Sequence, residues 1–247
     1  RYRAVWTNSE GSVNSNPATL TVNAIPAPPS VTVTDDCGIS VLTAGNYTGT
    51  LLWNNTATTQ SITVSTPGTY TVTQTVNGCT SATGSGTAAP KAVPAAPIVT
   101  VTDDCGNSVL TATDYTGTLL WSTGETTASI TVTTPGTYTV TQTIGCCISA
   151  TGSGTAAPKA IPSAPTVTVV NDCGSSVLTA TNYTGELLWS TGETTSSITV
   201  TTPGTYTVTQ SVNGCVSPIR SRTAAPKAIP QAPTVIVSNN CGNSSLV

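Results

Sequence analysis

The sequence predicts an all-β fold made of tandem β-sandwich modules of 68 residues. Two sets of cysteines repeat at intervals of 68 positions: Cys37, Cys105, Cys173 and Cys241, and Cys79, Cys147 and Cys215. A fixed period of this length is typical of an array of similar units. Thr, Ser, Val, Gly and Pro dominate the composition, only 7% of residues are charged, and Phe is absent. This composition favours strands and turns, so we expect almost no helix.

The period also sets the expected organisation of the 247 residues. Whole modules are expected at 28–95, 96–163 and 164–231, with partial modules at 1–27 and 232–247. The first fragment matches the last two strands of a module of another subtype, and the last fragment supplies only the first two strands. Because neither can bury an apolar face alone, we interpret the chain as a window on a longer protein. The alternative is that subunits donate strands to one another.

The central module is the clearest copy, and its first three strands are expected at Val99–Thr102, Ser108–Ala112 and Leu119–Trp121. The first reads VTVT, which is the alternation of a half-buried strand. The residues between the first two strands include Asp and Gly, which favour a turn. Trp121 is the largest apolar side chain available to a core that is poor in aromatic residues.

Two further strands are expected at Ile130–Val132 and Tyr138–Thr141, joined by a corner at Pro135–Gly136. This order is similar to the tyrosine corner of immunoglobulin-like sandwiches, in which a Tyr near the start of a late strand bonds back to nearby backbone. Antibody domains carry a Cys two residues after this Tyr, whereas here the place is held by Val140. We therefore expect immunoglobulin-like modules without the central disulfide between the two sheets.

The cysteines lie instead at the start of the second strand and just after the turn that follows the tyrosine strand. They are 42 positions apart in every copy, which favours one disulfide per module: Cys37 with Cys79, Cys105 with Cys147, and Cys173 with Cys215. Closing such a loop would stabilise a small module by about 3 to 4 kcal/mol. The two turns belong to opposite ends of a standard sandwich, however. The alternative pairing is therefore between neighbouring modules, for example Cys37 with Cys147.

Cys146 and Cys241 are expected to be unpaired or to form intermolecular bonds. Cys146 replaces the Gly found at 78 and 214, and an odd Cys in a secreted chain can cross-link subunits. The simpler interpretation is a lone thiol. The chain has no His and no CxxC pair, so disulfides fit the recurring cysteines better than zinc. Disulfides in turn indicate an oxidising, extracellular compartment.

Proline-rich connectors separate the modules, at 88–97, 156–165 and 224–233. Prolines every few residues hold a backbone near polyproline II, so these segments are expected to be semi-rigid spacers. An array built on them is expected to be stiff.

A specific string carries a family resemblance. Residues 189–208 read WSTGETTSSITVTTPGTYTV, with CGSSVLTA at 173–180 before them and NGC at 213–215 after them. This pattern resembles the immunoglobulin-like repeats of very large secreted surface proteins of Bacteroidota, including adhesins linked to gliding motility. The resemblance covers 28–247 well and 1–27 more loosely. It implies export by the type IX route, location at the cell surface, and a role as a stalk, adhesin or filament.

Composition and charge exclude several classes of function. The chain lacks His, and its few carboxylates cluster in turns, so we expect neither an enzyme nor a cofactor. A net charge of -3 offers no basic surface for nucleic acid. No apolar run approaches the roughly 18 residues of a membrane-spanning helix. Paired acids at Asp35–Asp36 and Asp103–Asp104 suggest calcium, but Asn171 and Asn239 replace the first acid in later copies, and turn residues are the better interpretation.

Three functions remain. The first is a structural segment of a long surface adhesin, stalk or fibre, whose partners are neighbouring modules or other copies of the chain. The second is a module that binds host or environmental surface glycans through its loops or its Thr-rich faces. The third is a subunit of a helically ordered extracellular filament. The repeated residues belong to the core, the turns and the cysteines rather than to a polar or aromatic cluster, which favours the structural function.

Overall fold

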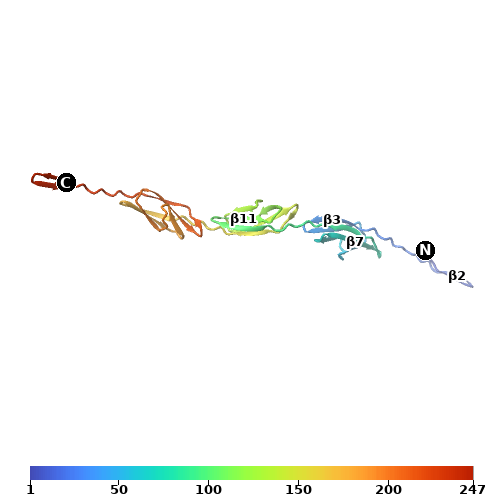
Figure 1. Cartoon of the computed structure of the whole chain (residues 1–247). Helices are drawn as coiled ribbons and strands as arrows, with labels where there is room; N and C mark the ends of the chain where they lie inside the picture. The colour runs from blue at the N-terminus through green and yellow to red at the C-terminus, as the bar shows by residue number, and fades with distance from the viewer. Residues whose placement is uncertain (247) are drawn as a thin grey trace. The chain divides into compact units, whose positions relative to one another are not determined.

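The computed structural model describes residues 1–246, and their regular secondary structure consists of β-strands (Figure 1). The all-β prediction is therefore confirmed. No helix that is long and apolar enough to cross a membrane is present among these residues. All strand pairings given below are antiparallel, and equivalent strands begin at Ser30, Ile98 and Thr166.

The first module contains two sheets, and Figure 1 draws β3 and β7 in the same group of strands. One sheet has the order β3-β4-β6, formed by Ser30–Asp36, Ile39–Gly45 and Ser61–Val64. In the other sheet, β7 (Gly68–Val76) pairs with β5 (Thr50–Trp53), β8 (Cys79–Thr80) and β9 (Gly84–Ala88).

The next two modules repeat this arrangement. In the second, β10-β11-β13 comprises Ile98–Asp104, Asn107–Thr113 and Ser129–Val132, and β14 (Gly136–Ile144) pairs with β12 (Thr118–Trp121), β15 (Cys147–Ile148) and β16 (Gly152–Ala156). In the third, β17-β18-β20 comprises Thr166–Asp172, Ser175–Thr181 and Ser197–Val200, and β21 (Gly204–Val212) pairs with β19 (Glu186–Trp189), β22 (Cys215–Val216) and β23 (Arg220–Ala224). All five strands expected in the central module are confirmed, each within a slightly longer observed strand.

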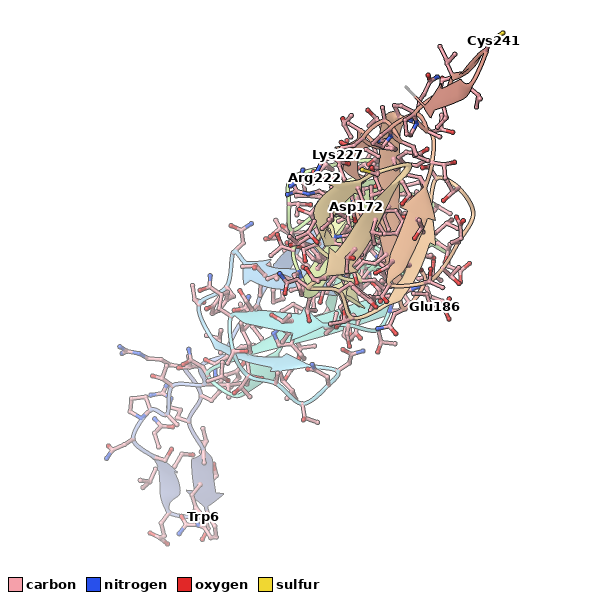
Figure 2. All side chains as sticks on the ribbon, turned by 90° about the vertical axis from the view of Figure 1, so that its left-hand side faces the viewer. Trp6, Asp172, Glu186, Arg222, Lys227 and Cys241 are labelled. Carbon is pink, nitrogen blue, oxygen red and sulfur yellow. A yellow bond between two sulfur atoms is a disulfide. The ribbon has the colours of Figure 1, made fainter. Side chains whose placement is uncertain are left out.

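A hairpin is present at each end of the described chain. The first pairs β1 (Val5–Asn8) with β2 (Gly11–Asn14), and the last pairs β24 (Val237–Asn240) with β25 (Asn243–Leu246). Trp6 in the first hairpin is exposed, and Figure 2 shows Cys241 at the tip of the last one. The strands expected at both ends are therefore present as isolated hairpins.

The first and third modules are β-sandwiches, because the inward-facing residues of their two sheets form one apolar core each. In the third module, Leu178 of one sheet and Trp189 and Val208 of the other belong to the same cluster. Trp189 is 2% exposed, and its indole Nε1 donates to the Thr195 carbonyl at 2.8 Å. The alternation of apolar and polar residues in the sequence is the physical cause, since successive side chains on a strand point to opposite faces.

The tyrosine corner is confirmed in all three modules. The hydroxyls of Tyr70, Tyr138 and Tyr206 donate to the carbonyls four residues earlier, at 3.0 to 3.1 Å. This bond fixes the Pro-Gly corner before the longest strand of each module. The division into β3-β4-β6 and β5-β7-β9 fits the immunoglobulin-like interpretation, which remains a prediction, as do the exact module boundaries.

Candidate functional site

The disulfides join neighbouring modules, so the favoured pairing within modules is wrong. Cys37 of the first module bonds Cys147 of the second, and Cys105 of the second bonds Cys215 of the third, each with a sequence separation of 110. Cys79 and Cys173, which were expected to pair within their modules, carry free thiols, as do Cys146 and Cys241. The alternative pairing proposed from the sequence is the correct one.

The reason for the error is the position of the two turns in each module. Cys37 follows β3, and it forms a bridge with Lys91, which lies in the connector that leaves the module. Cys79 follows β7, and its Sγ lies 3.9 Å from the carbonyl of Asn23, in the segment that leads into the module. The two cysteines therefore lie at opposite ends of the sandwich. Constant spacing in sequence reflected the repeat and not proximity in space.

The start of each connector is fixed to the module it leaves. Lys91 N donates to the Asp36 carbonyl at 2.9 Å, and Gly38 N donates to the Lys91 carbonyl at 2.8 Å. The same pair of bonds recurs at Lys159 and Lys227, and Figure 2 shows Lys227 beside Asp172. This short parallel bridge lies directly next to the cysteine of the turn. It holds the connector against the end of the module where the disulfide forms.

An acid or amide in the same turn holds the connector one step earlier. Asp35 Oδ1 accepts hydrogen bonds from Ser40 Oγ at 2.5 Å and from Ala89 N at 3.0 Å. Because these bonds favour the charged form, with the Ser40 bond the largest cause, the pKa of Asp35 is lowered; the nearby Lys91 charge acts in the same direction, and desolvation opposes it. Asp103 makes equivalent bonds, and its pKa is lowered in the same way.

Asn171 makes the same two bonds in the third module, to Ser176 Oγ and Ala225 N. A neutral amide oxygen therefore performs the same structural role as the carboxylates of Asp35 and Asp103. This agrees with the interpretation of the paired acids as turn residues.

A buried glutamine holds the other end of each connector, and the sequence interpretation missed it. Gln142 Nε2 donates to the Ala95 carbonyl at 2.8 Å, while its Oε1 accepts from the backbone N–H groups of Thr116 and Gly117. Gln74 and Gln210 do the same in their modules. The signal was present, because Gln142 continues the inward-facing alternation that includes Val140. A polar residue at such a position needs hydrogen-bond partners.

Each described junction therefore consists of one disulfide and one connector that is hydrogen-bonded at both ends. A disulfide that closes a loop of this size stabilises the folded chain by about 5 kcal/mol in the chain-entropy model. Such a junction restrains two modules and leaves no catalytic group in place.

The first junction contains a third sulfur. Cys146 Sγ lies 3.9 Å from Cys37 Sγ, and Lys91 Nζ lies 3.3 Å from Cys146 Sγ. In the part of the chain with described side chains, the sulfurs of Cys37, Cys146 and Cys147 are the one group of three metal-capable atoms, all within 4.8 Å of one another. Two of them form the disulfide, so a single thiol remains as a ligand.

Comparisons with known proteins identify no family. No protein-family model matches this chain, and no curated protein matches it. Among solved structures, one described as a "Ca2+-stabilized adhesin" that "helps an Antarctic bacterium reach out and bind ice" is 18% identical over 92% of this chain and 80% of its own, with a TM-score of 0.40.

Two other solved structures match about half of the chain. A mouse coronavirus receptor-binding domain complexed with its murine receptor is 12% identical, covering 53% of this chain and 100% of its own, with a TM-score of 0.28. The chicken interferon gamma receptor alpha chain is 9% identical, covering 53% of this chain and 98% of its own, with a TM-score of 0.28. Similarities of this size do not define a shared function.

Proposed function

We propose that this chain is a tension-bearing segment of a long extracellular surface protein of the adhesin, stalk or fibre type. The observation that carries the proposal is the pair of disulfides between successive modules, Cys37–Cys147 and Cys105–Cys215. A disulfide within a module would stabilise that module alone. A disulfide between modules passes force from one module to the next without loading the hydrogen bonds between strands.

The hydrogen-bonded connectors support the same function. Lys91 and Ala95 are fixed to successive modules and lie only four positions apart. A connector fixed at such close intervals has few conformations to lose when the chain is pulled, since the conformational entropy of a free linker grows with its length. Pro94 lies between the two fixed points and restricts the backbone further.

The proposed location is outside the cell, because disulfides form and persist in oxidising compartments. Surface labelling tests the location: antibodies against the module sequence should label intact producing cells, and brief protease treatment of those cells should remove the signal. Labelling only after permeabilisation would contradict the proposal. Pulling single molecules by their ends tests the mechanical function, and modules that unfold at forces no higher after oxidation than after reduction of both disulfides would count against it.

The second candidate function is a subunit of an ordered filament, and one observation favours it. Leu52, Leu120 and Leu188 occupy equivalent positions in β5, β12 and β19, and each is more than half exposed. An apolar side chain repeated on one strand of every module could pack against other copies of the chain. Electron microscopy of purified protein distinguishes the two functions, because filaments with helical order support assembly and separate chains support the stalk. A Leu52→Thr, Leu120→Thr, Leu188→Thr variant should abolish any such order.

A further inference from the structure

The two described junctions differ by one sulfur. The first contains Cys37, Cys147 and the additional thiol of Cys146, whereas the second contains Cys105 and Cys215, with Gly214 at the position of Cys146. We propose that Cys146 makes the first junction exchangeable: its thiol attacks Cys37 and moves the bridge from Cys37–Cys147 to Cys37–Cys146. The second junction has no such thiol and stays fixed.

Three distances place the reacting atoms together. Cys146 Sγ lies 3.9 Å from Cys37 Sγ, all three sulfurs lie within 4.8 Å of one another, and Lys91 Nζ lies 3.3 Å from Cys146 Sγ. Lys91 is itself fixed, because its backbone bonds to the turn that holds Cys37. The lysine therefore keeps the free sulfur beside the disulfide, and a rotation about the Cys146 side chain brings it into line for attack.

Burial selects Cys37 as the atom attacked. Cys147 is 3% exposed, whereas Cys37 is half-buried and Cys146 is exposed. An exposed thiol reaches the more accessible of the two sulfurs, and access is one determinant of exchange rates.

The step is balanced and needs no external oxidant or reductant. Cys146 loses its proton to solvent, and its thiolate forms a bond to Cys37 Sγ. The Cys37–Cys147 bond breaks, and Cys147 leaves with the electron pair and takes up a proton. One disulfide and one thiol are present before and after. The modules stay covalently linked, but the attachment point moves from β15 (Cys147–Ile148) to the residue in the turn before it.

Differential alkylation of the oxidised full chain tests the exchange. The protein is held at mildly alkaline pH, quenched with acid, alkylated with one reagent, reduced, and alkylated with a second reagent. Fragmentation spectra then locate the first label on Cys146 or Cys147. We expect the first label on both residues, appearing over roughly seconds to hours. A first label confined to Cys146 would overturn the proposal, and so would a first label on Cys37, which would indicate a bond between Cys146 and Cys147.

Matched variants transfer and remove the effect. Asn213→Gly with Gly214→Cys copies the Gly145–Cys146 pair into the second junction, so the first label should appear on residue 215 as well as 214. Cys146→Gly restores the residue of the other copies, and Cys147 should then stay unlabelled by the first reagent. Cys147→Ser should bond Cys37 to Cys146 in the folded protein, and a variant in which both remain free would contradict the proposal. If that variant does not fold, the copied pair in the second junction gives the decisive result.

Discussion

At the scale of single residues, the turns that carry the bridging cysteines depend on one side-chain oxygen each. Asp35 and Asp103 provide a carboxylate and Asn171 provides an amide, and all three bond a serine hydroxyl and the backbone N–H that starts the connector. Ser40 is 0% exposed, so its hydroxyl needs this partner. The chain thus contains its own comparison between a charged and a neutral acceptor.

The first prediction concerns acid stability. Because hydrogen bonds to the carboxylates lower the pKa of Asp35 and Asp103, these groups stabilise the folded chain above the unfolded pKa of about 3.9 and lose this contribution as the pH falls through the lowered value. An Asp35→Asn, Asp103→Asn variant should therefore lose less in Tm between pH 7 and pH 3 than the wild-type protein.

Thermal unfolding followed by circular dichroism at the two pH values gives the comparison, and the unchanged Asn171 shows that the amide is accepted by the fold. Equal losses of Tm in both proteins would show that these bonds do not depend on charge. Asp35→Ala is the control for the bond itself, and it should lower the Tm by a few degrees at both pH values.

The buried glutamines give the second prediction. Gln210 is 3% exposed, and it donates to the Ser163 carbonyl while accepting from Thr184 N and Gly185 N. Gln210→Glu keeps the acceptor and removes the donor, so it should cost about 1 to 2 kcal/mol of unfolding free energy. Gln210→Ala also leaves two N–H groups without a partner and should cost more. Denaturant unfolding measures both, and equal stabilities of the two variants would show that the bond to Ser163 contributes nothing.

The sequence predicted the cysteines, the tyrosine corner and the strands because each depends on local chemistry or on the period. It did not predict the pairing of Cys37 with Cys147, since a repeat shows which residues are equivalent and not which ends of two modules meet. The role of Gln142 was also missed, although an inward-facing amide at that register is a visible exception. Local patterns thus predicted the modules, while the junctions depend on contacts between residues 110 positions apart.

At the scale of elements, the connector packs on the turn that it leaves. Gly106 has φ +78°, and a Cβ added there would lie 2.9 Å from Cδ1 of Ile161 in the following connector. The turn thus needs a glycine twice, once for the left-handed backbone and once for the close approach of the connector. The apolar residue of the connector packs where any side chain in the turn would collide with it.

The third prediction separates these two causes. Gly106→Ala should destabilise the chain by more than the about 1 to 2 kcal/mol expected for a left-handed alanine. Gly124→Ala is the matched control, because Gly124 also has positive φ but nothing within 4 Å of an added Cβ. Denaturant unfolding of both variants provides the measurement. If Gly106→Ala costs no more than Gly124→Ala, the contact with Ile161 contributes nothing to the junction.

At the scale of the whole molecule, the two disulfides close overlapping segments, 37–147 and 105–215. A fully unfolded chain pulled at its ends can run from Cys37 to Cys215 by either bridge. In both cases the path contains 68 residues of chain, from 37 to 105 or from 147 to 215. Each disulfide alone therefore limits the extension as much as both together.

The fourth prediction is that loss of one disulfide leaves the extended length unchanged and loss of both increases it. Cys105→Ser with Cys215→Ser, or Cys37→Ser with Cys147→Ser, should give the same final contour length in force spectroscopy as the oxidised wild-type chain. The variant that lacks both bridges should gain 110 residues, which is roughly 350 to 400 Å of extended chain. Pairing within modules would instead give separate gains that add. A stepwise increase, one step for each disulfide removed, would show that the bridges do not overlap, and a chain that exchanges Cys147 for Cys146 should still behave as singly closed, since the redundancy requires only that one covalent link remains at each junction that is tested.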